Sequence, residues 1–334
     1  MPFKVKISGT PYEFTAEANQ TLLEAGKEAG FLLPSGCCSG MCGACKAQLI
    51  SGEVVLKPYQ PHALTDADRE FGLTLLCRAQ PTSDVEIKVR DVKLAKKKVE
   101  DMEVEIVEKT ILEPSILRLV LKRTDGQLFD FKAGQTYAVV LPGNTLRCYS
   151  VASPETQKET ITFLIRKVTN GMFTGLLFSE SLRVGDKMRL RGPEGTSTFS
   201  TPKGKKAVFL ATGTGIASVK SIVSTLIEKN DLEGRDLNIF WGVRNSAELV
   251  EGEQFEEWSQ THPQIKYTAV VSREEEWPGA KGHVQTVAAT EIGDMTNVDA
   301  YMCGNAAMIK AATNFLTVRC GLREDHIFTD NFGY

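Results

Sequence analysis

Short stretches of alternating hydrophobic and polar residues begin the chain and predict a small mixed α/β unit. The pattern alternates on both sides of Ser8-Gly9-Thr10-Pro11, which is typical of a β-hairpin. Thr21 and Glu24 have the spacing of a capping box, so we expect a helix that starts there and ends at Gly30. The strands expected in this unit are 3–7, 12–14, 47–50 and 85–89.

The hydrophobic pattern changes twice further along the chain. The basic segment 93–98 has no core-forming pattern and is interpreted as a linker. Beyond it, short strand-like runs separated by turn clusters predict an antiparallel barrel, with strands at 104–107, 116–121, 137–141, 161–165 and 188–190. From Lys206 on, strands alternate with helices and predict a parallel sheet with crossovers. These strands are 207–210, 237–241, 267–271 and 299–302, and the helices are 217–228, 254–259, 284–289 and 307–318.

Composition and charge narrow the class of protein. The 334 residues suit two or three domains. Lys plus Arg is 39 and Asp plus Glu is 42, so the chain lacks the basic excess of a nucleic-acid binder. Apolar runs fall far short of the roughly 20 residues of a membrane span, and the first residues do not have the apolar core of a signal peptide. We therefore expect a soluble, cytoplasmic protein.

The cysteines carry the strongest chemical signal. Disulfides are rare in the cytoplasm, so four of the eight cysteines crowded into nine residues point to metal or redox chemistry. Cys37-x4-Cys42-x2-Cys45, with the distant Cys77, has the plant-type [2Fe–2S] spacing. Two irons bridged by sulfides need four thiolates from a loop that wraps closely, and glycines beside these cysteines supply the backbone freedom.

Two other interpretations of the cysteine loop are considered: a zinc site and a thioredoxin-like redox pair. A zinc site usually pairs two short cysteine knuckles, whereas Cys77 has no near partner. A thioredoxin-like pair, Cys42 and Cys45, leaves two of the four cysteines without a role. Cys38 falls outside the ligand spacing and is interpreted as a non-ligand thiol. Cys148 and Cys320 are interpreted as small buried hydrophobic residues.

Two further segments predict cofactor binding. Arg147, Tyr149 and Ser150 close a barrel strand and offer positive charge, a stacking face and a hydroxyl, and a helix expected at 175–180 offers an N-terminus for a pyrophosphate. Gly213-Thr214-Gly215 forms a strand–turn–helix junction at which a second pyrophosphate can approach the backbone. This turn is not the complete Gly-x-Gly-x-x-Gly fingerprint.

A nicotinamide dinucleotide bound at this glycine turn is either NADH or NADPH. Residues that follow two strands of the parallel sheet bear on which of the two it is. Arg244, Ser272 and Arg273 lie where the adenosine ribose would bind, and Arg273 with Lys281 could hold a 2′-phosphate. The glutamates at 274–276 oppose that added charge. We expect NADH as the donor, with NADPH as the alternative.

The segment Cys37-Cys38-Ser39-Gly40-Met41-Cys42-Gly43-Ala44-Cys45, with Leu75-Leu76-Cys77-Arg78-Ala79, resembles the ferredoxin domain of three-domain oxygenase reductases. Benzoate dioxygenase and methane monooxygenase reductases belong to this family, and CDP-6-deoxy-glucoseen reductase has the same architecture. The resemblance extends over essentially the whole chain. It implies a multidomain α/β plus all-β fold: a β-grasp [2Fe–2S] ferredoxin domain (1–92), the linker (93–98), an antiparallel FAD-binding barrel (99–203) and a parallel-sheet NAD(P)-binding domain (204–334).

The same resemblance implies roles for individual residues. The cluster ligands are Cys37, Cys42, Cys45 and Cys77. The FAD-binding residues are Arg147 at the pyrophosphate, Tyr149 on the isoalloxazine, Ser150 near flavin N5, and Lys167, Gly171, Met172, Thr174 and Phe332. The nicotinamide nucleotide is assigned to Gly213, Thr214, Gly215, Arg244, Ser272, Arg273, Cys303, Gly304 and Met308. The residues expected at the reacting atoms are Ser150, Cys303 and Asp330.

This chain departs from the family pattern at four positions. Asn170-Gly171 stands where relatives often have two glycines, and Thr174 where they have serine. Ser218 replaces a proline, and Asp330 replaces a glutamate. Thr174 and Asp330 keep the chemical type, so we expect their contacts to survive.

Together the three sites imply a converter between two-electron and one-electron chemistry. Nicotinamide gives electrons in pairs, an iron–sulfur cluster accepts them singly, and a flavin does both. The expected function is the reductase component of a terminal oxygenase, either a Rieske dioxygenase or a di-iron monooxygenase. The alternatives are a reductase for a deoxysugar dehydratase or another acceptor protein, and a non-enzymatic redox sensor, which would not need the flavin and nicotinamide motifs.

Overall fold

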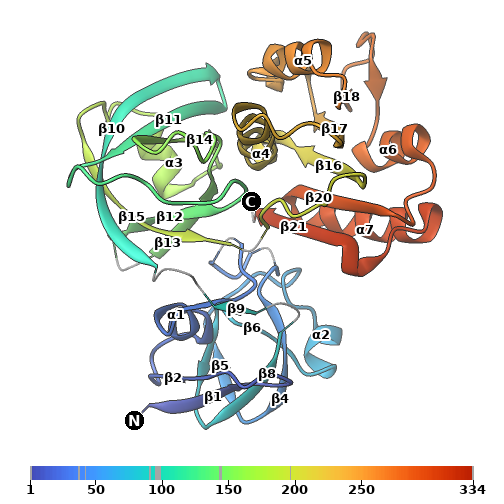
Figure 1. The fold of residues 1–334 in the computed structure, drawn as a ribbon. Helices are drawn as coiled ribbons and strands as arrows, with labels where there is room; N and C mark the ends of the chain where they lie inside the picture. The colour runs from blue at the N-terminus through green and yellow to red at the C-terminus, as the bar shows by residue number, and fades with distance from the viewer. Residues whose placement is uncertain are drawn as a thin grey trace.

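The computed structural model describes residues 2–36, 38–41, 43–89, 92–94, 99–142, 145–195 and 197–332, with the side chains of 93, 331 and 332 outside that description. Three lobes follow one another along the chain (Figure 1). The N-terminal lobe lies at the bottom of the view, the barrel at the upper left and the parallel sheet at the upper right. The last strand, β21 (Ile327–Phe332), ends where the three lobes meet.

The N-terminal lobe is a mixed sheet covered by one helix, which confirms the β-grasp prediction. Its strand order is β2-β1-β8-β4-β6, and β1 and β8 are parallel while the other pairs are antiparallel. The Thr21–Glu24 capping box starts α1 as expected. The elements are β1 (Phe3–Ile7), β2 (Glu13–Ala16), α1 (Leu22–Glu28), β3 (Phe31–Leu32), β4 (Lys46–Ser51), β5 (Val54–Leu56), α2 (Asp66–Glu70), β6 (Leu73–Leu75), β7 (Ala79–Pro81), β8 (Val85–Lys88) and β9 (Lys93–Leu94).

Part of the predicted linker belongs to this lobe. β9 lies at its first two residues and pairs antiparallel with β3. Residues 95–98 lie outside the described residues.

The second lobe is a six-stranded antiparallel barrel, as the spacing of its strands predicts. The strand order is β13-β12-β15-β10-β11-β14, and a bridge between Val151 and Phe163 joins the end of β13 to β14. The edges of the sheet thereby meet. The elements are β10 (Glu100–Glu113), β11 (Ile116–Arg123), β12 (Thr136–Leu141), β13 (Thr145–Ser150), β14 (Thr160–Arg166), α3 (Met172–Leu177) and β15 (Lys187–Glu194).

The helix expected at 175–180 is misplaced by three residues. It begins at Met172, immediately after the N-cap Gly171. Thr174 Oγ1 accepts a 3.1 Å hydrogen bond from the Val168 amide, which closes the preceding turn and directs the chain into the helix earlier. This side-chain contact carries no periodic signal, so the hydrophobic pattern does not reveal it.

The third lobe is a parallel sheet flanked by helices, again as predicted. The strand order is β19-β18-β17-β16-β20-β21, and the short strand β19 and the final strand β21 were not expected. The elements are β16 (Lys206–Thr212), the 3₁₀ turn η2 (Gly213–Gly215), α4 (Ile216–Glu228), β17 (Asp236–Val243), η3 (Ser246–Glu248), α5 (Gly252–Thr261), β18 (Ile265–Val271), β19 (Ala280–Lys281), α6 (Val284–Ile292), β20 (Val298–Asn305), α7 (Ala306–Cys320) and η4 (Glu324–His326), followed by β21.

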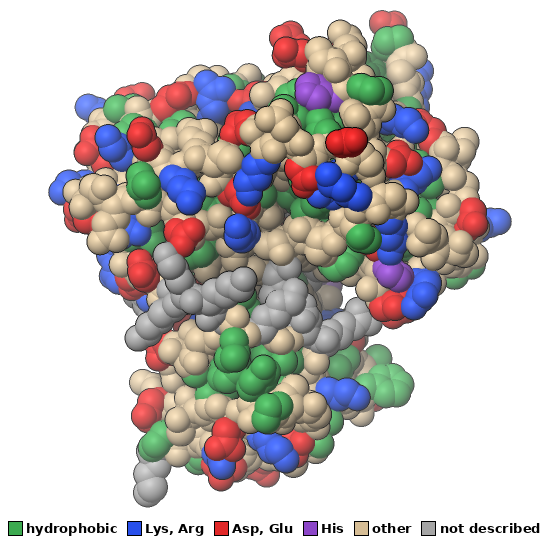
Figure 2. Space-filling view, in the orientation of Figure 1, with side chains coloured by type: hydrophobic (Ala, Val, Ile, Leu, Met, Phe, Trp, Pro, Cys, Tyr) green, Lys and Arg blue, Asp and Glu red, His purple; other side chains and the backbone are tan. Residues whose placement is uncertain are grey.

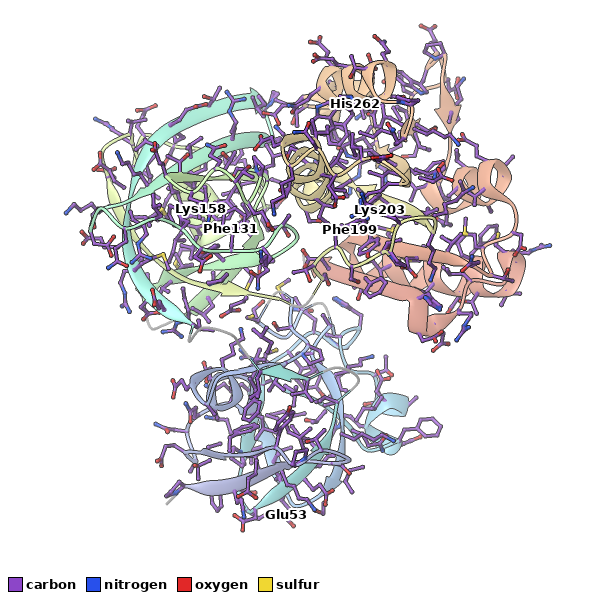
Figure 3. The ribbon with its side chains drawn as sticks, viewed as in Figure 1. Glu53, Phe131, Lys158, Phe199, Lys203 and His262 are labelled. Carbon is purple, nitrogen blue, oxygen red and sulfur yellow. The ribbon has the colours of Figure 1, made fainter. Side chains whose placement is uncertain are left out.

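The buried hydrophobic clusters show which lobes share a core. Barrel residues such as Ile116 and Leu164 share one buried cluster with Val219 and Ile222 of α4. Phe199 (Figure 3) also packs against the rings of Phe209 and Tyr301, with centroids 6.0 and 5.4 Å apart. The N-terminal lobe has a hydrophobic core of its own. The second and third lobes therefore form one packed body.

The surface agrees with a protein of near-neutral charge. Figure 2 shows acidic and basic side chains interspersed over the upper lobes, and hydrophobic side chains gathered on the visible face of the lower lobe. Within the described part of the chain, none of the helices is long and apolar enough to span a membrane.

Candidate active site

Two of the four predicted cluster ligands lie among the described residues, and they meet where two strands pair. Cys45 directly precedes β4 and Cys77 lies just beyond β6, and because these strands pair, the two buried Sγ atoms lie 3.2 Å apart. Gly43 has φ +76°, and a Cβ there would lie 2.9 Å from the Ala63 carbonyl oxygen. Cys37 and Cys42 lie outside the described residues. The soft thiol donors and the close backbone fit an iron–sulfur cluster.

A cavity at the end of β13 joins the cluster loop to the barrel. Its walls include Arg147, Tyr149 and Ser150 from β13, and Ser39 and Met41 from the cluster loop; they also include Cys148, Leu164, Arg166, Val168, Gly171, Met172, Phe173, Thr174, Thr214 and Ala217. The Tyr149 ring lies 5.9 Å from Phe173 and 6.1 Å from Phe163. An aromatic face, a guanidinium and a glycine turn around an apolar wall suit a flavin nucleotide.

Three predicted flavin residues differ in how they meet this cavity. The Thr174 hydroxyl lines it, but its hydrogen bonds are with Val168 and Gly171. Lys167 does not line this cavity, because its ammonium lies over the Phe178 ring, 5.6 Å from the centroid. The side chain of Phe332 lies outside the described part of the chain.

The three residues expected at the reacting atoms converge at the junction of the second and third lobes. Ser150 Oγ donates a 2.5 Å hydrogen bond to Asp330 Oδ2. Asp330 lies on β21 directly opposite Cys303 on β20. Burial raises the pKa of Asp330 to about 6, and the hydrogen bond from Ser150 opposes part of that rise. A carboxyl with such a pKa changes charge just below neutral pH.

Cys303 is held as a protonated thiol. Burial raises its pKa to about 12, and the Asp330 carboxylate adds to that rise. Ser218 Oγ donates a 2.8 Å hydrogen bond to Cys303 Sγ. Ser218 has no expected contact from the sequence, where the family resemblance marks it only as a departure from proline. The structure therefore gives this departure a partner at the site.

The nicotinamide groove lies at the carboxyl ends of the parallel strands, where ligands bind in such sheets. Its lining includes Gly213, Thr214, Arg244, Ser272, Arg273 and Met308, which the sequence predicted, and Asn305, which it did not. A Cβ at Gly215 would lie 2.3 Å from the Cys303 carbonyl oxygen, and one at Gly304 would lie 2.2 Å from Thr212 Oγ1. A side chain at either position would clash with its neighbour, so the two glycines let β20 and the turn after β16 pack closely.

The first of the three glutamates after β18 has a defined place beside the groove. Glu274 accepts hydrogen bonds from the amide and the hydroxyl of Ser246, at 2.8 and 3.1 Å. These bonds hold the pKa of Glu274 below its usual value. Glu274 directly follows Arg273 in the chain, so its negative charge counts against the binding of a 2′-phosphate at this end of the groove.

Sequence reasoning missed Arg166, the last residue of β14. It lines both the flavin cavity and the nicotinamide groove, and Gly213 lies next to its guanidinium. Its Nη2 donates to Glu248 Oε2 at 2.5 Å, which links the barrel to the third lobe. Two features of the sequence mark Arg166 as a candidate: its basic side chain and its place in the alternation of the strand. From the sequence, however, the flavin contact is assigned to the neighbouring Lys167.

Comparison with protein families divides the chain in the same order as the lobes. Residues 5–82 match the 2Fe-2S iron-sulfur cluster binding domain. Residues 103–199 match the oxidoreductase FAD-binding domain, and residues 209–314 the oxidoreductase NAD-binding domain. The three cofactor-binding domains expected from the sequence are therefore present.

Relatives align with this chain over nearly the whole length of both chains. The CDP-6-deoxy-L-threo-D-glycero-4-hexulose-3-dehydrase reductase of Yersinia pestis is 34% identical over 336 residues, which cover 99% of both chains. The phenol 2-monooxygenase reductase component of Pseudomonas sp. strain CF600 is 33% identical over 99% of this chain and 95% of its own. Among solved structures, an Amycolatopsis cytochrome P450 reductase superposes with a TM-score of 0.82 at 26% identity, covering 99% of this chain and 98% of its own.

Proposed function

Because this chain belongs to the family of three-domain ferredoxin, flavin and nicotinamide reductases, we propose that it is the reductase component of an oxygenase and is driven by NADH. It is a flavin iron–sulfur oxidoreductase. When bound, FAD supplies the exchange between electron pairs and single electrons, and the [2Fe–2S] cluster carries single electrons. The polypeptide supplies binding, orientation and a defined charge at each site.

One observation carries the proposal: residues of all three domains line a single cavity. Ser39 and Met41 come from the cluster loop, Tyr149 from the barrel, and Thr214 and Ala217 from the third lobe. A flavin in this cavity would therefore contact both its electron donor's domain and its electron acceptor's domain. That arrangement supports a direct route for electrons, in which the polypeptide does not move between the transfer to the flavin and the transfer to the cluster.

The side chains around the cavity have distinct tasks in this proposal. Arg147 and the Gly171 turn would hold the pyrophosphate, and Tyr149 would pack on the isoalloxazine. Ser150, held by Asp330, would offer its hydroxyl to the flavin at the junction with the third lobe. Cys303 fills the space beside it as a neutral thiol, so the junction excludes water without adding a charge.

The predicted domain boundaries remain part of the proposal: 1–92, 99–203 and 204–334, with 93–98 as the connection. Lys93–Leu94 pairs with Phe31–Leu32, so the first lobe extends two residues into that connection. Arg147, Tyr149 and Ser150 are proposed as cofactor contacts on their positions in the cavity, and Gly213 and Thr214 on theirs in the groove. Cys303 lines neither the cavity nor the groove and is proposed on its position opposite Asp330.

A dehydrase is the second candidate acceptor. The Yersinia relative is named as the reductase of a deoxyhexulose dehydrase and is as similar to this chain as the phenol monooxygenase reductase component is. The chemistry up to the cluster is common to both candidates, so the acceptor protein alone distinguishes them.

The test uses the purified holoprotein under anaerobic conditions. We expect NADH to support fast reduction of both ferricyanide and cytochrome c, with a higher kcat/KM than NADPH. Mixing the reduced protein with the oxygenase or dehydrase encoded beside it then identifies the acceptor. Protein that contains zinc or no metal after reconstitution, or that does not oxidise NADH when loaded, would overturn the proposal.

A further inference from the structure

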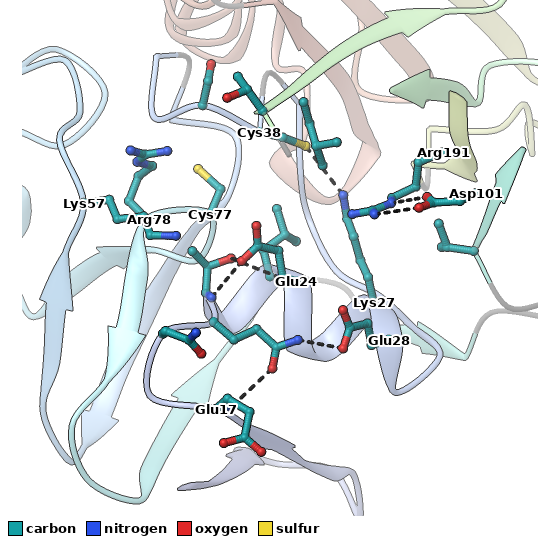
Figure 4. Close-up of a pocket in the computed structure, with 18 residues that line it drawn as sticks. Glu17, Glu24, Lys27, Glu28, Cys38, Lys57, Cys77, Arg78, Asp101 and Arg191 are labelled. Carbon is teal, nitrogen blue, oxygen red and sulfur yellow. Dashed lines mark hydrogen bonds and ion pairs between the residues drawn. The ribbon is translucent and has the colours of Figure 1, made fainter. Parts of the chain in front are cut away.

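Four side chains from two lobes meet behind the flavin strand. Lys27 comes from α1 and Cys38 from the cluster loop, while Cys148 lies on β13 and Glu194 ends β15. The Cys38 and Cys148 Sγ atoms are 3.1 Å apart although the residues are 110 positions apart in the chain. Figure 4 shows the Lys27 side chain reaching from α1 toward the Cys38 sulfur. This group brings two thiols from different domains into contact.

The group does not need a metal ion. The two sulfurs and a Glu194 oxygen lie within 4.8 Å of one another, which is close enough for three ligands of one cation. The Lys27 ammonium, however, is paired with Glu194 and lies 3.5 Å from Cys38 Sγ. The Lys27 ammonium already supplies the positive charge that a metal cation would bring. The two cysteines are therefore considered as free thiols.

The backbone on both sides aims the thiols at each other. Cys38 has φ +53°, a left-handed conformation that is uncommon for a residue with a side chain. On β13, alternation places the side chain of Cys148 on the opposite face from that of Tyr149, whose ring packs with Phe163 and Phe173. Cys148 therefore contacts the cluster loop through Cys38, while the residue also borders the flavin cavity.

Both cysteines of this pair are half-buried, and one of them borders an open cleft. Cys38 is half-buried and lines a cleft of about 990 Å³ between the first two lobes, together with Lys27, Arg78 and Arg191 (Figure 4). A small oxidant in this cleft can reach its sulfur. Bond formation then requires the sulfurs to approach by roughly 1 Å, because a disulfide bond is about 2.05 Å long.

We propose that Cys38 and Cys148 form a peroxide-reactive dithiol that closes to a disulfide between the ferredoxin and flavin domains. The Cys38 sulfur attacks one oxygen of hydrogen peroxide, the O–O bond breaks, and a sulfenic acid and one water form. The Cys148 sulfur then displaces the hydroxyl as a second water. Two thiols lose two electrons and two protons, and one peroxide is reduced to two waters. The bond ties the cluster loop to the flavin strand.

Peptide mapping of the loaded holoprotein tests this site. The protein is treated with about one equivalent of hydrogen peroxide while the cluster absorbance is recorded, free thiols are blocked, and trypsin is added without reductant. Cleavage at Lys27, Lys46, Arg147 and Lys158 releases peptides 28–46 and 148–158. We expect these two peptides to be joined, and to separate when a reductant is added.

Matched variants assign the bond. C38S keeps all four proposed cluster ligands, so it should keep the cluster absorbance and lose the joined peptides. C148S should also lose them, whereas C320S, which removes a cysteine of the third lobe, should retain them. If the peptides of C38S were still joined, the bond would belong to a cluster ligand. If the wild-type peptides were recovered with the Cys38 and Cys148 thiols both blocked, no bond would have formed. Either result overturns the proposal.

Discussion

Ser150 and Asp330 are 180 residues apart in the chain, yet Ser150 Oγ donates a 2.5 Å hydrogen bond to Asp330 Oδ2. The bond connects the end of the barrel strand β13 to the last strand of the parallel sheet. Both side chains are buried, at 4% and 5% exposure, so the bond lies away from bulk water. It is the contact through which the third lobe positions a hydroxyl of the flavin cavity.

Asp330 should make the stability of the protein depend on pH. Burial raises its pKa from 3.8 to about 6, so the folded protein binds the proton more tightly than the unfolded chain does. The free energy of unfolding therefore falls as the pH rises from about 4 through 6, by about 3 kcal/mol at most for this group. As the pH rises from about 4 to 7, the free energy of unfolding of D330N should increase relative to that of wild type, as measured by urea unfolding. D325N, at an exposed carboxyl, is the control, and an equal gain there would contradict the assignment.

Cys77 should be required for one-electron chemistry and dispensable for the flavin. In C77A we expect loss of the iron–sulfur absorbance and of cytochrome c reduction, because one of four thiolates is missing. Ferricyanide reduction by NADH should persist, since the flavin cavity is lined by other residues. C320A is the matched control for removing a buried cysteine. Full cytochrome c reduction by C77A would show that the cluster does not follow the flavin.

Ser218 should position the Cys303 thiol. S218A removes the 2.8 Å hydrogen bond to Cys303 Sγ, a neutral bond worth about 1 kcal/mol. We expect flavin reduction by NADH to slow by roughly fivefold, with the Kd for NADH unchanged, in stopped-flow measurements. S224A alters the same helix at a hydroxyl bonded to the Lys220 carbonyl, and it should behave as wild type. Equal slowing in both variants would point to a helix effect.

Glu274 should disfavour NADPH. Its carboxylate is fixed by Ser246 and directly follows Arg273, which lines the groove, so we expect it to repel a 2′-phosphate bound there. E274Q keeps the shape and removes the charge, so kcat/KM for NADPH should rise roughly tenfold relative to NADH, about 1.4 kcal/mol. Steady-state kinetics with both nucleotides measure the ratio. E276Q changes an exposed glutamate nearby, and a similar rise there would indicate a general charge effect.

Lys27 and Glu194 should stabilise the contact between the first two lobes. Both are buried, and Glu194 Oε1 has no hydrogen-bond partner among the described residues. K27M leaves a buried carboxylate unpaired, so we expect a loss of about 3–5 kcal/mol in the free energy of unfolding. The exposed pair Lys187–Glu103 is the control, and K187M should cost less than about 1 kcal/mol. If K27M and K187M had equal effects, the buried pair would not hold the lobes together. Restoration by K27M/E194L would identify the unpaired charge as the cause.

The order of elements could be predicted because its causes are local. A capping box, strand alternation and turn clusters act within a few residues, and the capping box at Thr21 starts α1 where it was expected. The short elements β3, β5, β6, β7 and α2 of the first lobe were not predicted. The strands β19 and β21 were missed because they lie at the two edges of the sheet, where pairing with a neighbour defines the strand. Helix α3 was misplaced because the Thr174–Val168 contact, and no periodic pattern, sets its start.

The amino-acid sequence by itself determined the cofactors of this protein, since thiolate spacing and glycine turns are written in consecutive residues. The tertiary structure alone decided which side chains from distant parts of the chain meet, both between domains and within the third lobe. Ser150 with Asp330, Ser218 with Cys303, and Cys38 with Cys148 are separated by 85 to 180 positions. Their contacts depend on how folded elements and lobes pack against one another, and no short-range pattern encodes that packing.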